Sequence, residues 1–223
     1  TATGMNASGI LEWAYTEIRR TFKTPILVTA GNHELWDISG DCHVDSITWL
    51  ESVFPMICGK VGLHCLDDEP YIEGNVGFVG TVGWYDYSLG DPGIPLEIYK
   101  RKTYQCIQWN DNLSFPPKMD DRSFARHTEK RLIAQIKKIR SKVDKIVAVT
   151  HMIPFAKLQV PGNRFVDGFG GTTKLGVILL ADPKVSLSIC GHRHVGNRVN
   201  IHHIDAVMLD SDYEWPRYTI LEL

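Results

Sequence analysis

The chain has 223 residues, 43% of them hydrophobic, which suits a single domain over residues 1–223 with a substantial core. The formal net charge is only −2, so no strongly basic field points to a nucleic acid or an anionic membrane as a partner. No apolar run is long enough to span a bilayer, and residues 1–9 have neither the basic nor the apolar part of a signal peptide.

Hydrophobic periodicity and turn residues predict helices and strands along most of the chain. The predicted helices cover residues 9–22, 45–54, 96–109, 120–141 and 173–181, and the second of these is expected to end at Pro55. The predicted strands cover residues 25–30, 145–150, 185–190, 197–203, 206–210 and 218–223, and residues 71–85 predict a hairpin that turns at Gly74-Asn75. Strands that alternate with helices, followed by a late run of strands, indicate an α/β fold with a mixed sheet or two.

Three of the predicted strands lead into side chains that commonly bind metals. These side chains are Asn32, His33 and Glu34 after the first strand, His151 after the second, and His192 and His194 after the third. In open α/β sheets, ligands collect outside the carboxyl ends of the strands, so these side chains meet in one crevice if the three strands are neighbours. Imidazole nitrogens and an amide oxygen suit a divalent ion. The pattern therefore predicts a metal site.

The same residues resemble the motifs of a known family. The calcineurin-like metallophosphoesterases carry five blocks in order: DxH, GDxxD, GNH(D/E), a lone histidine after a strand, and GHxH. This chain has the last three blocks, as Gly31–Glu34, His151 and Gly191–His194, each after a predicted strand. The resemblance implies a four-layer α/β/β/α sandwich of two mixed sheets.

The resemblance also implies a role for each residue. Asn32, His151 and His192 would bind one metal ion and His194 a second, while His33 would act on the reacting phosphate as the catalytic residue. The two ions would be divalent and drawn from Mn, Fe, Zn and Co, a choice that the ligands leave open. A metal-bound hydroxide would attack the phosphorus, because two metals can generate that nucleophile and clamp the phosphoryl oxygens.

The first two family blocks are absent, since no aspartate precedes Asp37. In the family these blocks supply ligands to one metal and the carboxylate that bridges both. We therefore expect an N-terminally incomplete domain that lacks its first strand–helix segment. Gly40–His43 contains a DxH sequence and Asp45 follows it, which leaves open a substitute for the missing ligands, although a loop that enters a helix is favoured.

Several further residues have two interpretations. Trp84–Asp86 could wall a substrate pocket or pack in the core, Arg193 could contact a phosphate or form a salt bridge, and His202 and His203 are expected at ordinary strand positions facing opposite sides. The chain has five cysteines, an odd number, and no CxxC pair, which favours a reduced, cytoplasmic protein. Among them, Cys190 is expected to be a small buried hydrophobe more than a metal ligand.

Two functional hypotheses follow from these observations. The first is a metal-dependent phosphoester hydrolase that acts on a phosphorylated small molecule or another phosphoester, with no nucleic-acid or membrane partner. The second is a catalytically inactive scaffold of the same fold that binds protein partners, as one retromer subunit does. The missing blocks favour the scaffold, whereas the retained histidines and Asn32 favour the enzyme.

Overall fold

The computed structural model describes residues 7–36, 44–114, 119–160, 162–211 and 217–223. The strands are β1 (Leu27–Val28), β2 (His64–Cys65), β3 (Tyr71–Glu73), β4 (Val76–Thr81), β5 (Thr103–Tyr104), β6 (Ile107–Gln108), β7 (Lys145–Thr150), β8 (Val185–Cys190), β9 (Asn197–Ile201) and β10 (Ile204–Met208). The α-helices are α1 (Ala7–Thr21), α2 (Ser46–Thr48), α3 (Phe54–Val61), α4 (Leu96–Arg101), α5 (Asp111–Ser114), α6 (Asp121–Ile139), α7 (Arg164–Asp167) and α8 (Thr173–Leu180). Two short 3₁₀ helices, η1 (His33–Leu35) and η3 (Ala156–Leu158), and a π-helical turn, η2 (Trp49–Val53), complete the described elements.

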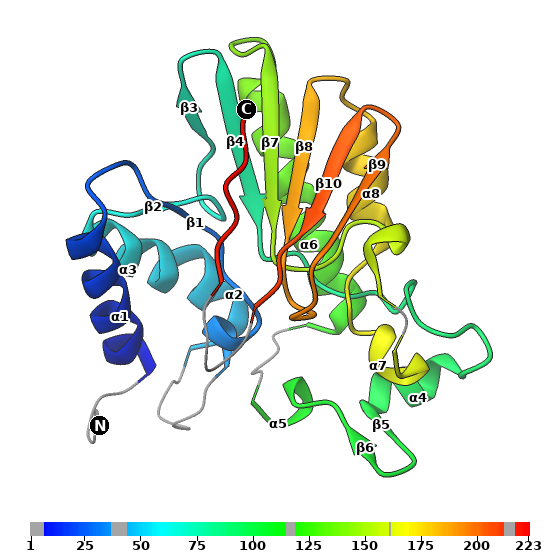
Figure 1. The fold of residues 1–223 in the computed structure, drawn as a ribbon. Helices are drawn as coiled ribbons and strands as arrows, with labels where there is room; N and C mark the ends of the chain where they lie inside the picture. The colour runs from blue at the N-terminus through cyan, green and yellow to red at the C-terminus, as the bar shows by residue number, and fades with distance from the viewer. Residues whose placement is uncertain (1–6, 37–43, 115–118, 161, 212–216) are drawn as a thin grey trace.

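A six-stranded mixed sheet forms the centre of the molecule (Figure 1). Its strand order is β3-β4-β7-β8-β10-β9, in which β4, β7, β8 and β10 are parallel and the edge strands β3 and β9 are antiparallel to their neighbours. A second sheet pairs β1 with β2 in parallel, and β5 and β6 form a separate antiparallel pair. The predicted α/β fold with a mixed sheet is therefore confirmed.

The two faces of the large sheet pack against different layers. Helices α6 and α8 cover one face, where Ala148 of β7 belongs to the same buried cluster as Leu132 of α6 and Leu179 of α8 (Figure 1). On the opposite face, Val147 and Leu187 pack with Leu221 of the C-terminal segment. The β1–β2 pair lies on the side of the molecule that α1 and α3 occupy. Layers on both faces explain why the central strands read as continuous apolar runs.

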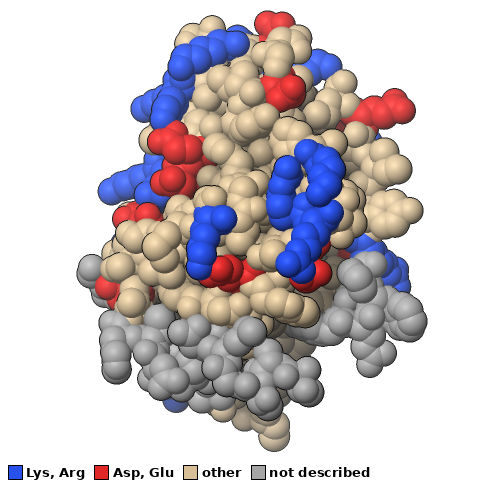
Figure 2. Space-filling model, turned by 90° about the vertical axis from the view of Figure 1, so that its left-hand side faces the viewer, with Lys and Arg blue, Asp and Glu red and all other residues tan. Residues whose placement is uncertain are grey.

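The surface on the α1 and α3 side carries both signs of charge. Figure 2 views this side and shows lysine and arginine side chains in small groups beside aspartate and glutamate. Ion pairs such as Lys60 with Glu12, 2.6 Å apart, contribute to this mixture. Within the described part of the chain, no helix has the length and apolar character needed to cross a membrane.

Several predicted elements are confirmed with small shifts at their ends. The hairpin turns at Gly74-Asn75 as expected, and Gly74 has the positive φ of 57° that such turns favour. Asp120 caps α6 by accepting from Ser123 N, and Thr172 caps α8 by accepting from Lys174 N. These local features depend on short-range sequence signals, which explains why they were predictable.

The prediction that a helix ends at Pro55 is wrong. Asp45 caps α2, but the helical segment continues through η2 into α3 and ends only at Gly62. The π turn of η2 comes directly before α3, and Pro55 occupies one of the first positions of α3, where a missing N–H costs little. The wider turn thus lets the chain stay helical.

Three further expectations are corrected. The helix predicted over residues 96–109 ends at Arg101, because Lys102 adopts a left-handed conformation and the chain then forms the β5–β6 pair. His202 and His203 lie in the turn between β9 and β10, with His202 at φ 54°, and not on a strand. Residues 218–223 form no strand.

Candidate metal centre

Two of the three predicted ligand-bearing strands are direct neighbours. Strands β7 and β8 are parallel and adjacent, so His151 and the loop that carries His192 leave the same edge of the sheet. Gly191 N donates to His151 O at 3.2 Å, which joins the two strand ends by a backbone bond. The third strand, β1, is not in this sheet, so the three strands are not all neighbours, and β1 is only half-buried.

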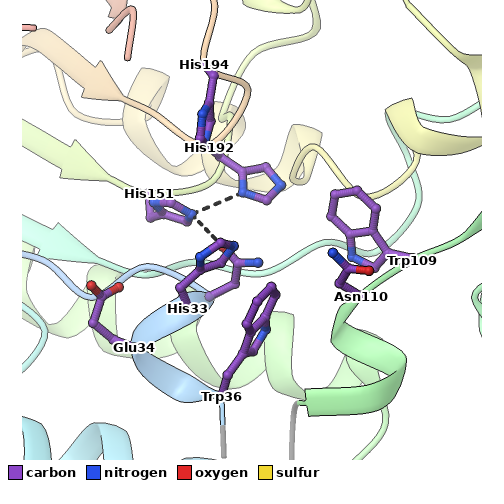
Figure 3. Close-up of a pocket in the computed structure, with 9 residues that line it drawn as sticks. His33, Glu34, Trp36, Trp109, Asn110, His151, His192 and His194 are labelled. Carbon is purple, nitrogen blue, oxygen red and sulfur yellow. Dashed lines mark hydrogen bonds between the residues drawn. The ribbon is translucent and has the colours of Figure 1, made fainter. Parts of the chain in front are cut away.

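The end of β1 nevertheless reaches the same place. Asn32 Oδ1 lies 2.9 Å from His151 Nε2, and that nitrogen lies 3.1 Å from His192 Nδ1 (Figure 3). Asn32 is 3% exposed, so these three atoms meet in a largely buried position. The predicted convergence of Asn32, His151 and His192 is therefore present in the structure, although their role as ligands stays a prediction.

Hydrogen bonding fixes which atoms present lone pairs. His192 Nε2 lies 3.0 Å from Phe169 O, so Nε2 carries the proton and Nδ1 is a bare acceptor. Since Asn32 Oδ1 and His192 Nδ1 both only accept, the proton between them belongs to His151 Nε2. A divalent cation at this point would replace that proton. A metal-binding imidazole commonly donates its second N–H to a carbonyl, as His192 does here.

The donor spacing fits a metal ion. Two donor atoms that each lie about 2.1 Å from one metal, at right angles to each other, are about 3.0 Å apart. The separations of 2.9 Å and 3.1 Å match this value. Among the described residues, no three His, Cys, Asp or Glu side chains form a metal-binding group by themselves, and the cluster includes the amide of Asn32. An amide oxygen with two imidazoles suits a borderline or hard divalent ion.

Burial keeps the histidines neutral. Burial lowers the pKa of His192 to about 3 and the pKa of His151 well below its ordinary value. Burial also lowers the pKa of His33. Neighbouring histidines add to the effect at His151. A neutral imidazole is the form that donates a lone pair to a metal, so the site is prepared to bind a cation at neutral pH.

The cluster opens into a cavity of about 350 Å³. The residues that line this cavity are Asn32, His33, Glu34, Trp36, Trp109, Asn110, His151, His192 and His194 (Figure 3). His33 stacks on Trp36 with ring centroids 3.8 Å apart, which fixes its ring beside the three donor atoms. Glu34 accepts from Gly31 N at 2.8 Å and so shapes the loop after β1. All of the predicted site residues therefore face one cavity.

The loop after β8 has an unusual backbone. His192 and His194 have φ values of 73° and 56°, in the left-handed region that histidine seldom adopts. Such conformations cost on the order of 1–3 kcal/mol each and concentrate at functional sites. Between them, Arg193 pairs with the buried Asp167 at 2.9 Å. Of the two roles considered for Arg193, a phosphate contact and a salt bridge, the structure has the salt bridge. The pair holds the strained loop in place.

The other residues that the sequence raised as site candidates do not line the cavity in the part of the chain that the structure describes. Trp84 and Tyr85 are core residues with 0% exposure, and Cys190 is buried at 1%. Asp45 is occupied as a helix cap, and Asp41, Cys42 and His43 of the possible substitute motif lie outside the described residues.

The sequence did not identify one wall of the cavity. Trp36, Trp109 and Asn110 line it, and Asp111 lies behind them. The segment of residues 109–111 follows β6 and no long apolar strand, so the strand-end argument could not find it. The tryptophan within a loop rich in aromatics was its only local signal.

Comparison with known proteins agrees with the motifs. A family model described as calcineurin-like phosphoesterase matches residues 4–196. The solved phosphopantetheinyl hydrolase from Mycobacterium tuberculosis is similar in fold, with a TM-score of 0.66 and 18% sequence identity, over 90% of this chain and 74% of that one. GAP50, the anchor in the inner membrane complex of Plasmodium, aligns with a TM-score of 0.33 and 14% identity over 64% of this chain and 35% of that one, which is too slight to bear on the fold. No curated protein sequence matches significantly. The family match covers most of the chain, and the chain belongs to the calcineurin-like phosphoesterases.

Proposed function

We propose that this chain is a phosphoester hydrolase that works with two divalent metal ions. The observation that carries the proposal is the convergence of Asn32 Oδ1, His151 Nε2 and His192 Nδ1 at metal-ligand spacing beside a cavity. Such atoms, buried and neutral, would have no use in a scaffold that only binds protein partners. When bound, the metals would polarise the phosphoryl oxygens and lower the pKa of a water molecule so that hydroxide is available near neutral pH.

Each predicted site residue has a role in this proposal. Asn32, His151 and His192 would hold one metal ion, and His194, which lines the same cavity, would contribute to the second. His33 would donate a hydrogen bond from its neutral ring to the oxygen that leaves the phosphorus, and its stacking on Trp36 limits its motion. Mn, Fe, Zn and Co all accept such donors.

The substrate would be a phosphorylated small molecule or another phosphoester that fits the cavity of about 350 Å³. The indoles of Trp36 and Trp109 and the amide of Asn110 give the cavity wall both apolar and polar character. A cytoplasmic setting belongs to the same proposal and is supported by the free thiols of the described cysteines, Cys58, Cys65, Cys106 and Cys190.

Metal analysis and hydrolysis assays test this function. Purified chain incubated with Mn²⁺ should retain the metal and hydrolyse an aryl phosphate monoester or diester. His33→Ala should lower kcat on the order of 10²–10⁴-fold while leaving bound metal unchanged. His127→Ala is the matched control, because His127 contacts Glu51 away from the cavity. Protein that stays metal-free at saturating Mn²⁺ would favour the scaffold, and equal activity in His33→Ala would remove His33 from the mechanism.

A further inference from the structure

One buried carboxylate behind the metal cluster connects four side chains. Asp111, which is 1% exposed, accepts at Oδ1 from Asn32 Nδ2 at 3.0 Å and from Trp36 Nε1 at 2.6 Å. At Oδ2 it accepts from Tyr85 OH at 3.0 Å and from Trp109 Nε1 at 2.7 Å. All four sites of one carboxylate are thus used, and three of these partners line the cavity or touch its ligands.

The chemistry of the partners fixes the state of Asp111. An indole nitrogen can only donate, and one indole reaches each oxygen of Asp111, so both oxygens serve as hydrogen-bond acceptors. Burial, followed by the nearby Asp111 and Asp121, raises the pKa of Tyr85 well above its ordinary value, which keeps its hydroxyl a donor.

This arrangement determines which way the Asn32 amide points. A carboxylate oxygen can only accept, so Asn32 must present Nδ2 to Asp111 and thereby turn Oδ1 towards His151 Nε2. A flipped amide would bring its oxygen against the carboxylate and aim an NH₂ group at the metal position, where it could not ligate a cation.

We propose that Asp111 is a positioning residue that locks the Asn32 amide in its metal-binding orientation. The inference rests on the proposed metal-dependent function and extends it to a residue outside the predicted ligand set. Partners that orient metal ligands are worth about 10–100-fold in metal affinity. The same carboxylate holds Trp36 and Trp109, so it couples the ligand to the cavity wall.

The chain offers a matched control for the structural cost of losing such a carboxylate. Asp121 is also buried and accepts from an indole and a phenol, Trp84 Nε1 at 2.8 Å and Tyr87 OH at 2.5 Å, as well as from Lys102 Nζ at 2.9 Å. It lines no part of the metal cavity. A variant at Asp121 therefore lowers stability through a similar network without acting on Asn32.

The test measures Mn²⁺ affinity by titration calorimetry and the apo-protein Tm for the full chain and its Asp111→Asn and Asp121→Asn variants. We expect Asp111→Asn to weaken Mn²⁺ binding about 10–100-fold and Asp121→Asn to leave it within about three-fold, although both lower Tm. In an Asn32→Ala background, Asp111→Asn should cause no further loss, because its effect passes through Asn32.

The outcomes separate the two proposals. A wild-type chain that binds no Mn²⁺ overturns the metal-dependent function and this inference with it. A wild-type chain that binds Mn²⁺ while Asp111→Asn binds within about three-fold as tightly, or while Asp121→Asn loses as much, overturns the inference alone. If Asp111→Asn does not fold, Asp111→Glu takes its place, since it keeps the charge but displaces the carboxylate by one methylene, and unchanged affinity there would overturn the inference equally.

Discussion

The two halves of the proposed metal site are held in place by different means. His151 and His192 leave the ends of β7 and β8, which pair along the sheet from Ile146 opposite Val185 to Val149 opposite Ile189. Many backbone hydrogen bonds therefore share the task of placing these histidines.

The half that carries Asn32 depends on single side chains. Strand β1 has only two residues, and three carboxylates hold the segment that follows it. Asp67 accepts from Ala30 N at 2.7 Å, Glu34 from Gly31 N at 2.8 Å, and Asp111 from the Asn32 amide at 3.0 Å. Strand ends that are placed by many hydrogen bonds tolerate the loss of one contact better than a loop that is held at three points. Single substitutions should therefore affect the β1 half more.

The largest effect is expected at Asp67, which joins the two halves. Its Oδ2 accepts from Ala30 N, and its Oδ1 accepts from Val82 N, just after β4, at 2.5 Å. Asp67→Ala leaves two buried N–H groups unpaired, each of which costs about 1–3 kcal/mol, so we expect a loss of about 3–5 kcal/mol in unfolding free energy with the side-chain void included. Urea denaturation measures this loss. The exposed neighbour Asp68→Ala should change stability by less than about 0.5 kcal/mol, and equal losses would contradict a tether at Asp67.

The same carboxylate should make the connection between the halves depend on pH. Burial raises the pKa of Asp67 from 3.8 to about 6, although the N–H groups of Ala30 and Val82 act in the opposite direction. Between these two values the folded state binds more protons than the unfolded state, so the unfolding free energy falls as pH rises from 4 to 6. The contribution is at most about 3 kcal/mol and is fully lost above the folded pKa.

Asp67→Asn isolates that contribution, because an amide does not titrate. From pH 4 to pH 7, wild type should lose up to about 3 kcal/mol of unfolding free energy relative to Asp67→Asn. Denaturation curves at several pH values supply the measurement. A difference that does not vary with pH would show that Asp67 keeps an ordinary pKa in the folded protein.

The contrast between the halves also explains what the sequence could predict. Apolar strands that end in His151 and His192 are local patterns, and parallel strands place their ends at one edge, so this half of the site was expected. The residues that hold the other half are distant in sequence from their partners. Asp111 lies 79 residues from Asn32, and Asp67 lies 37 residues from Ala30. No periodicity or cap signal connects such pairs, because only tertiary packing brings them together.

Errors in the predicted elements have a similar origin. Pro55 was expected to end a helix because proline lacks an N–H, yet the preceding π turn of η2 accommodates it. A π turn has no sequence signal of its own. The sequence left open which strands lie beside residues 25–30, because apolar character alone does not determine which sheet a strand joins, and β1 pairs with β2.

The smallest effect of a substitution is expected at Gly80 of β4, where the two sheets touch. A Cβ at Gly80 would lie 2.5 Å from Leu66 Cβ and 2.8 Å from Thr29 Oγ1, so Gly80→Ala must push the β1–β2 layer away from the large sheet. Overpacking of this kind costs about 1–3 kcal/mol, and the displaced β1 end should also weaken Mn²⁺ binding. Gly77→Ala is the matched control on the helix-covered face, because its Cβ meets the flexible end of Ile139, which can rotate away. Calorimetric Tm values and Mn²⁺ titration of both variants decide the matter: if Gly77→Ala weakens Mn²⁺ binding as much as Gly80→Ala does, the site does not depend on how the β1 half is seated against the sheet.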